Sequence, residues 1–367
     1  MRGEPDDTVR LNRPRTAPRP PRPVVLSAAV LVVLAGLAGA GAWWSMRPVA
    51  VPTAPAPALA PAPAPPPFAP PLATEAQILA DAPEALAVYR YTSEPDVVVL
   101  QFPSLAEQGR MLNRVAALIE KAGFPHDRVL PTDELNAKIV ASGDTPATFY
   151  YGHDYRAADL LRFLGLAAGS SMTEEEHRLQ SLVALLGWRD ASARGALISL
   201  VRQSDGDGID ASARATILRH ELSHGLYFTD PAYADFVRRF WTETMSPRDR
   251  AQFTAFLVKD GYDPAIEDLI INETQAYLMY TADKRFFSAA DLGMPEARLD
   301  TLRRQFLASM PPSWLRDLTT VPPSLPLIPV KAPRRYGPLL VRRTRVDTAR
   351  RAPRRLAASR AARSSRT

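Results

Sequence analysis

The sequence predicts a mostly helical domain of the α+β class, in which several helices surround a small sheet. Long stretches of the 367 residues repeat apolar side chains at helical spacing, and many begin at a Ser, Thr or Asp that can cap a helix. Two short runs, DVVVLQF (96–102) and ALISLV (196–201), are instead almost continuously apolar, which is typical of buried strands. The chain has no cysteine, so neither a disulfide nor a thiolate ligand is available, and stability has to come from a packed core.

The N-terminal region predicts a membrane anchor. Residues 1–23 form a basic segment, and residues 24–44 form an uncharged run of 21 residues that as a helix would span roughly 31 Å, about the thickness of a bilayer's hydrocarbon core. The arginines before this run favour a cytoplasmic N-terminus, so we expect a single-pass protein of the cell (inner) membrane with its bulk periplasmic or extracellular. A cleaved secretory signal is the alternative, because AGAGA offers small residues before a cut; the length of the run favours the uncleaved anchor.

Two further segments differ in composition from the domain. Residues 45–72 alternate Pro and Ala, which favours an extended polyproline II spacer. Residues 321–367 are rich in Pro and Arg, so we expect a disordered basic tail that either binds anionic lipid or cell-wall polymer or is solvated without a specific partner. Residues 331–367 carry a net charge of +12 and residues 48–330 one of −10, so the high pI describes the tails. The exported location argues against a nucleic-acid partner.

The domain from 73 to 320 is expected to follow one order of elements. The strand at 96–102 precedes a helix at 104–123 that Ser104 can cap, and the strand at 196–201 precedes a motif that carries the chemistry. Thr173 and three glutamates suit the start of another helix. The remaining helices are expected at 132–143, 154–169, 173–188, 231–245, 247–260, 264–285 and 295–309.

The motif lies in ATILRHELSHGLYF (215–228), a stretch that Asp210 can cap and that could end at Gly225. Residues four apart lie on one face of a helix, so His220 and His224 could offer two imidazole nitrogens to one Zn2+ ion. Glu221 could then act as the general base that takes a proton from the water attacking a carbonyl. Without a metal, the same pattern would be two histidines on a buried helix.

With these residues the chain resembles the zincin metallopeptidases, whose active-site helix carries His-Glu-x-x-His. The resemblance covers about residues 195–280 and implies hydrolysis of peptide bonds in a peptide or protein substrate. In these enzymes the substrate commonly lies along an edge strand of the sheet close to the helix, and GALISL (195–200) stands where such an edge strand would be. A cell-wall peptide would suit the spacer, but no residue selects it.

A third protein ligand is needed if one position on zinc stays open, and three residues compete for this role. Glu273 lies in NETQA on an apolar helix, and this segment is similar to the Asn-Glu-x-x-Ala segment of gluzincins, the branch with a glutamate ligand. It follows His224 by 49 residues, whereas known gluzincins use about twenty, so extra helices would have to lie between. Glu243 follows His224 at the shorter spacing of known gluzincins but does not lie in an Asn-Glu-x-x-Ala segment. Asp230 has the metzincin position without its glycine turn, and could instead cap the helix that begins at Pro231.

Three other residues are candidates for the site. Tyr277 and Tyr280 share the helix face of Glu273, so either could donate a hydrogen bond to the oxyanion of the reaction or could simply be packed; Tyr277 could also orient a metal ligand. His153, in FYYGHDY, could line a substrate cleft or belong to a surface turn.

The sequence therefore predicts a membrane-anchored, extracytoplasmic zinc peptidase with His220, His224 and Glu273 as metal ligands. Two alternatives remain open. In one, a zincin-like domain binds or scaffolds without catalysis, and its zinc is structural with a filled fourth position. In the other, the helical domain holds no metal, and the anchor and the tail carry the function.

Overall fold

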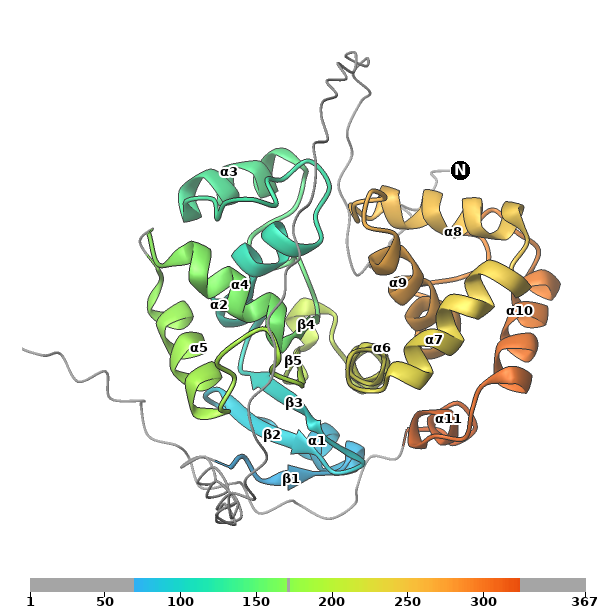
Figure 1. The fold of residues 1–367 in the computed structure, drawn as a ribbon, viewed down its shortest axis with the longest axis horizontal. Helices are drawn as coiled ribbons and strands as arrows, with labels where there is room; N and C mark the ends of the chain where they lie inside the picture. Colours follow the sequence, from blue (N-terminus) through green and yellow to red (C-terminus); the bar gives the residue numbers. More distant parts are fainter. Residues whose placement is uncertain (1–68, 170–171, 324–367) are drawn as a thin grey trace, which may run out of the picture.

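The computed structural model describes residues 69–169 and 172–323, without the side chain of Asp205 (Figure 1). The basic segment 1–23, the expected anchor at 24–44, most of the linker and most of the basic tail lie outside these residues. Within the described part, no helix combines the length and the apolar character needed to cross a membrane.

A mixed five-stranded sheet forms the first part of the fold, so the predicted α+β class is confirmed. Its strands lie in the order β1-β2-β3-β5-β4. The pairs β1/β2 and β3/β5 are parallel, and β2/β3 and β5/β4 are antiparallel. The strand bounds are β1 Leu72–Ala73, β2 Ala87–Tyr91, β3 Glu94–Phe102, β4 His153–Arg156 and β5 Ala196–Val201.

The edge strand was wrongly assigned from the sequence. The run 196–201 does form a strand, but β5 lies between β3 and β4 and is buried along its whole length. The edge next to it is β4, whose His153 pairs with Ser199. A strand covered on both faces needs the continuous apolar run that ALISLV provides, whereas a half-covered strand would alternate.

Helices cover both faces of the sheet, and the alternation of strand side chains decides what each face meets. On one face Ser199 donates to Gln108 of helix α2. Asp154, the neighbour of His153 on β4, points to the opposite face, where its carboxylate approaches His224 of helix α6. The elements of this half include α1 Glu75–Ala80, α2 Leu105–Ile119, α3 Thr132–Ala141, α4 Ala157–Ala167, α5 Glu174–Leu185 and α6 Ala211–Thr229, with a short 3₁₀ turn at Asp205–Asp207.

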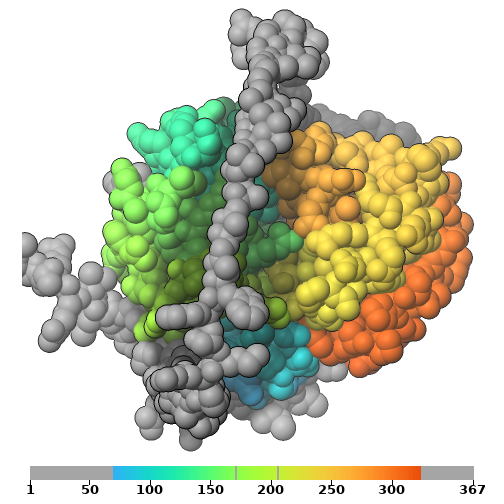
Figure 2. Space-filling view, viewed as in Figure 1, coloured from blue at the N-terminus to red at the C-terminus, as the bar shows by residue number. Residues whose placement is uncertain are grey.

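The second half is a group of helices on the other side of α6. Figure 1 shows α6 almost end-on between the sheet with its helices and the helices that follow. Figure 2 shows the two halves side by side on the surface, cyan to green against yellow to orange. The later elements are α7 Pro231–Arg239, a π-helical turn at Phe240–Thr244, α8 Pro247–Lys259, α9 Glu267–Tyr280, α10 Glu296–Ser309 and α11 Trp314–Leu318.

The predicted helix starts are mostly confirmed. Ser104, Thr173 and Asp210 each accept a hydrogen bond from a backbone N–H in the first turn of their helix. The helix expected at 154–169 begins later, because residues 153–156 pair with β5 as an edge strand. Gly225 does not end α6: a Cβ atom there would lie 2.8 Å from Val97, so glycine lets the helix pack closely on β3.

Candidate metal centre

Helix α6 carries His220, Glu221 and His224 at the centre of the molecule. It packs against β3, β4 and β5 on one side and α9 on the other, and its residues from Ala213 to Tyr227 are all buried. Its apolar side chains fill both interfaces. The polar residues of the motif are consequently buried as well, with His224 fully inaccessible and Glu221 4% exposed.

Helix α9 brings Glu273 to the same place. Nearly every residue of this helix from Ile270 to Tyr280 is buried, as the apolar sequence around NETQA indicates. Between His224 and Glu273 the chain forms α7, the π-helical turn and α8 before it returns as α9. These are the extra helices that the separation of 49 residues requires.

The predicted ligand groups converge. One ligand atom from each of His220, His224 and Glu273 lies within 4.8 Å of the other two. The Glu273 carboxylate lies between the two rings: its Oε2 is 3.6 Å from Nε2 of His220, and its Oε1 is 3.7 Å from Nε2 of His224. Among the described residues, none hydrogen-bonds to Nε2 of His224 or to Oε2 of Glu273. Buried polar atoms without partners are rare, and two imidazoles with one carboxylate fit a divalent metal ion.

Thr281 determines which nitrogen of His220 is free. Its Oγ1 lies 2.7 Å from Nδ1 of His220 and donates its single hydrogen to the backbone oxygen of Ala276 at 3.1 Å. The hydroxyl must therefore accept from Nδ1–H, which leaves the lone pair on Nε2 directed at Glu273. Thr281 lies just after the end of α9 and was not predicted from the sequence.

A chain of hydrogen bonds fixes the two helices against each other. Ser223 donates to the backbone oxygen of His220 at 2.7 Å, and Gln275 donates through Nε2 to Ser223 Oγ at 3.0 Å. Tyr233 of α7 donates to Oε1 of Gln275 at 2.8 Å. All of these groups are buried, so a change of register between α6 and α9 would leave several of them unpaired.

Glu221 lies beside the ligands with one carboxylate oxygen available. Its Oε2 is buried and accepts no hydrogen bond from the described residues. Its other oxygen lies against Gly152 at the start of β4, where a Cβ atom would come within 2.1 Å of it. Only glycine leaves room for the carboxylate in this position.

Burial dominates the electrostatics of the centre. It lowers the pKa of His220 to about 3 and that of His224 to about 4, so both rings are neutral at neutral pH. It raises the pKa of Glu221 well above its usual range, and the charges of Glu273 and Glu120 raise it further. Burial also raises the pKa of Glu273, against the lowering effect of His224. A bound cation would offset the burial of these carboxylates.

Two more carboxylates, Asp154 and Glu120, reach the centre without having been expected. Oδ2 of Asp154 lies 3.7 Å from Nε2 of His224. Asp154 forms one close set with Glu221 and His224, and a second with Glu120 and Glu273, each within 4.8 Å. In the sequence, FYYGHDY predicted a role for its histidine, and no pattern pointed to the aspartate beside it.

His153 itself faces away from the ligands. It is buried in β4, its Nδ1 lies 2.8 Å from the hydroxyl of Tyr155, and its ring stacks on Tyr150. It is therefore neither in a surface turn nor among the groups around the metal ligands. Successive side chains of a strand point to opposite faces of the sheet, so Asp154, the next residue, points to the site instead.

The two tyrosines of α9 differ in their surroundings. The ring of Tyr277 packs edge-on against His220 with centroids 4.8 Å apart, and on its other side against Phe256. This contact suits a residue that orients a ligand. The hydroxyl of Tyr280 donates to Sδ of Met310 at 3.7 Å, so the expectation that it faces a substrate is not supported.

The competing third ligands lie elsewhere. Asp230 accepts from the backbone N–H of Ala232 at 2.8 Å and of Tyr233, which makes it the cap of α7. Glu243 is exposed in the π-helical turn. Neither belongs to a close set of metal-ligating groups among the described residues.

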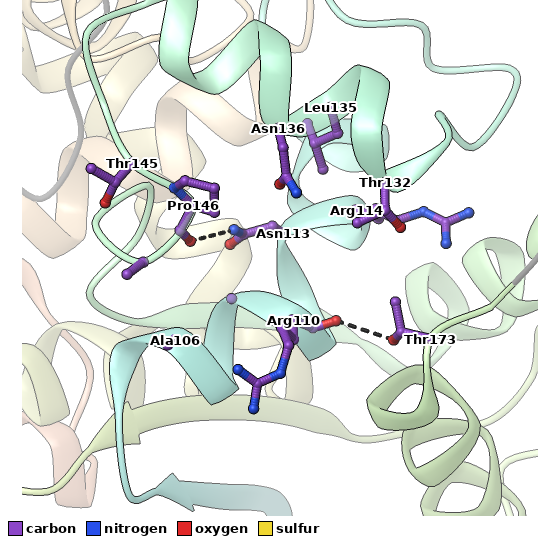
Figure 3. Close-up of a pocket in the computed structure, with 12 residues that line it drawn as sticks. Ala106, Arg110, Asn113, Arg114, Thr132, Leu135, Asn136, Thr145, Pro146 and Thr173 are labelled. Carbon is purple, nitrogen blue, oxygen red and sulfur yellow. Dashed lines mark hydrogen bonds between the residues drawn. The ribbon is translucent and has the colours of Figure 1, made fainter. Parts of the chain in front are cut away.

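A cavity of about 400 Å³ opens between α2 and α3, away from this centre (Figure 3). Its wall includes Asn113, which donates to a backbone carbonyl at 2.7 Å. Two arginines of the wall are already paired, Arg110 with Glu175 and Arg114 with Glu176. No candidate metal ligand lines this cavity.

No family model matches the chain, and neither a curated protein nor a solved structure matches it.

Proposed function

We propose that the protein is a zinc-dependent peptidase of the gluzincin type, anchored in the membrane by residues 24–44 with its domain outside the cytoplasm. One observation carries the proposal: His220, His224 and Glu273 offer three ligand atoms within 4.8 Å, and Glu221, which has one unpartnered oxygen, brings a carboxylate oxygen within 4.8 Å of His224. Two neutral imidazoles and one carboxylate are a common ligand set of catalytic zinc.

The residues around the proposed metal site have separate roles in this reaction. Zinc bound there would supply a Lewis acid that polarises the peptide carbonyl and acidifies water. Glu221 takes the proton of the attacking water on its free Oε2 and passes it to the leaving amine. Thr281 holds His220 in the tautomer that binds metal, and Tyr277 keeps its ring in place.

The edge strand favours an extended peptide as the substrate. The outer side of β4 pairs with no other strand in the described part of the chain. An extended peptide can add to such an edge through backbone hydrogen bonds. Gly152 and Asp154 of this segment lie next to Glu221 and His224, so a peptide paired with β4 would pass the metal ligands.

The test is zinc content together with peptide hydrolysis in the full-length protein. Wild type should hold about one equivalent of zinc. Glu221→Gln should keep the zinc and lose roughly 10²–10⁴ in kcat, because an amide cannot accept the proton. Glu273→Ala should lose the zinc. Glu243→Gln, an exposed glutamate outside the centre, is the matched control and should behave as wild type.

Wild-type protein without zinc, or a Glu273→Ala variant with full zinc affinity, would refute the proposal.

A structural zinc in a non-catalytic domain is the second candidate, and one distance favours it. Oδ2 of Asp154 lies 3.7 Å from Nε2 of His224, so Asp154 would be the fourth ligand of such a zinc and would leave no position for water. In that case Asp154→Asn should weaken zinc binding and wild type should hydrolyse no peptide. If the position is open, Asp154→Asn keeps its zinc.

A further inference from the structure

The second carboxylate set of the centre contains no histidine. Glu120 at the end of α2, Asp154 of β4 and Glu273 of α9 each bring one carboxylate oxygen within 4.8 Å of the other two. Glu273 also belongs to the set with the two histidines. A site for a second ligand therefore adjoins the metal ligands and shares one residue with them.

Two carboxylates that belong to this set or share a close set with one of its members each have an unpartnered buried oxygen. Oε2 of Glu221 and Oε2 of Glu273 are buried and accept no hydrogen bond from the described residues. Among the described residues, one lysine, Lys121, is buried near the set, and its charge acts to lower the pKa of Glu120 and of Glu273. Its Nζ donates to the backbone oxygen of Asp260 at 3.1 Å and lies over aromatic rings. A cationic group bound beside the set would offset the cost of burying its carboxylates.

An ammonium group fits this set better than a second metal ion. Three oxygens without nitrogen would suit calcium or magnesium, but those ions take six or more ligands, and zinc prefers nitrogen or sulfur. An ammonium group has three N–H donors on one nitrogen. Hydrogen bonds of about 2.8 Å from a tetrahedral nitrogen place its acceptors about 4.6 Å apart. The three oxygens of the set lie within 4.8 Å of one another, so one nitrogen can reach all of them.

The shared residue fixes which ammonium group can bind. A cation on one oxygen of Glu273 lies next to a metal on the other, so the ammonium must be close to the carbonyl under attack. The α-nitrogen of an amino acid lies about 3 Å from the carbonyl oxygen of its own residue, whereas a lysine ammonium is several bonds farther.

We propose that Glu120, Asp154 and Glu273 bind the free α-ammonium group of the substrate, so that the protein removes single residues from peptide N-termini. This inference rests on the proposed peptidase function and specifies its substrate. The side chain of Asp154 is 11% exposed, more than Glu120 or Glu273, so its carboxylate is the part that an incoming amine meets first. The three carboxylates close the site on the N-terminal side of the substrate's first residue. A substrate bound for cleavage at an internal bond would place an uncharged peptide group there and bury the carboxylates without a cation.

The first test compares peptides with free and acetylated N-termini. Wild type should cleave the free peptide and release its first residue, with a kcat/KM about ten- to a hundredfold above that of the acetylated peptide. Asp154→Asn and Glu120→Gln should lose this preference while each keeps one equivalent of zinc. Glu243→Gln should retain it.

The second test measures binding without turnover. In the zinc-loaded Glu221→Gln variant, alaninamide should raise the melting temperature, and N-acetylalaninamide should not. Adding Asp154→Asn should abolish that difference, and the melting temperature of the double variant before ligand addition reports whether it is folded.

Equal cleavage of both peptides, or cleavage at internal bonds, overturns the proposal while leaving zinc peptidase activity intact. Two equivalents of metal in wild type that fall to one in Asp154→Asn would overturn it in favour of a second metal ion. Absence of zinc from wild type would instead refute the proposed function itself.

Discussion

The hydrogen bond between Thr281 and His220 should control zinc affinity. In Thr281→Val a methyl group replaces the hydroxyl at nearly constant shape, so Nδ1 of His220 loses its acceptor at 2.7 Å inside the core. The ring is then free to turn and to place its proton on Nε2, the nitrogen that has to face the metal. Partners of metal-binding histidines typically account for a ten- to hundredfold change in affinity, which is about 1.4–2.7 kcal/mol.

The assay is a zinc titration in competition with a chelator of known affinity. Thr281→Ser is the control, because it keeps both the contact with His220 and the hydrogen bond to Ala276 and should bind zinc nearly as wild type does. Loss of that second hydrogen bond in Thr281→Val should also cost about 1 kcal/mol of the free energy of unfolding. A Thr281→Val variant with wild-type zinc affinity would show that the hydroxyl does not hold the ring, and the reasoning would fail.

Three other predictions follow from single contacts. Gly152→Ala should push the Glu221 carboxylate aside and lower kcat at least tenfold with zinc retained, whereas Gly165→Ala, with open space around its Cβ, should leave activity unchanged. Asp230→Ala should cost about 1 kcal/mol in urea unfolding as a lost cap but keep full zinc affinity; lost zinc would revive it as a ligand. Burial lowers the pKa of His153 to about 3, so in acid the unfolded chain binds a proton that the folded state does not, and the free energy of unfolding falls from about pH 6.5 towards pH 3. His153→Phe removes this contribution, so its stability should fall less steeply with acid, by up to about 1.4 kcal/mol per pH unit; identical slopes in urea titrations of metal-free protein would contradict the assignment.

The residues that sequence reasoning found are those whose signal is local. His220 and His224 share a helix face by spacing alone, and Glu273 stands out because an ionisable group on so apolar a helix needs a partner. The caps of α2, α5, α6 and α7 were likewise readable from their first turns. Fold class follows from the same patterns, since helical and strand periodicities differ.

The residues that it missed depend on which elements meet in space. Asp154 and Gly152 reach α6 only because β4 takes the edge beside β5, and the strand order is not encoded in either segment. Thr281 approaches His220 across 61 residues of chain, through the crossing of α6 and α9. From the sequence, Gly225 suggested the end of a helix. In the structure, the close approach of Val97 explains why a glycine stands at this position.

The number of residues between His224 and Glu273 and the position of Glu273 around its helix have different effects on the site. The entropy of closing a loop grows slowly with its length, so residues added or removed on the solvent side of α7 or α8 should be tolerated as long as these helices still pack on α9. A single residue inserted within α9 before Glu273 is a different change, because it turns the carboxylate by 100° around the helix and away from both imidazoles. Chains that build this centre can therefore differ widely in the distance between their ligands, while the position of the glutamate on the returning helix has to stay fixed.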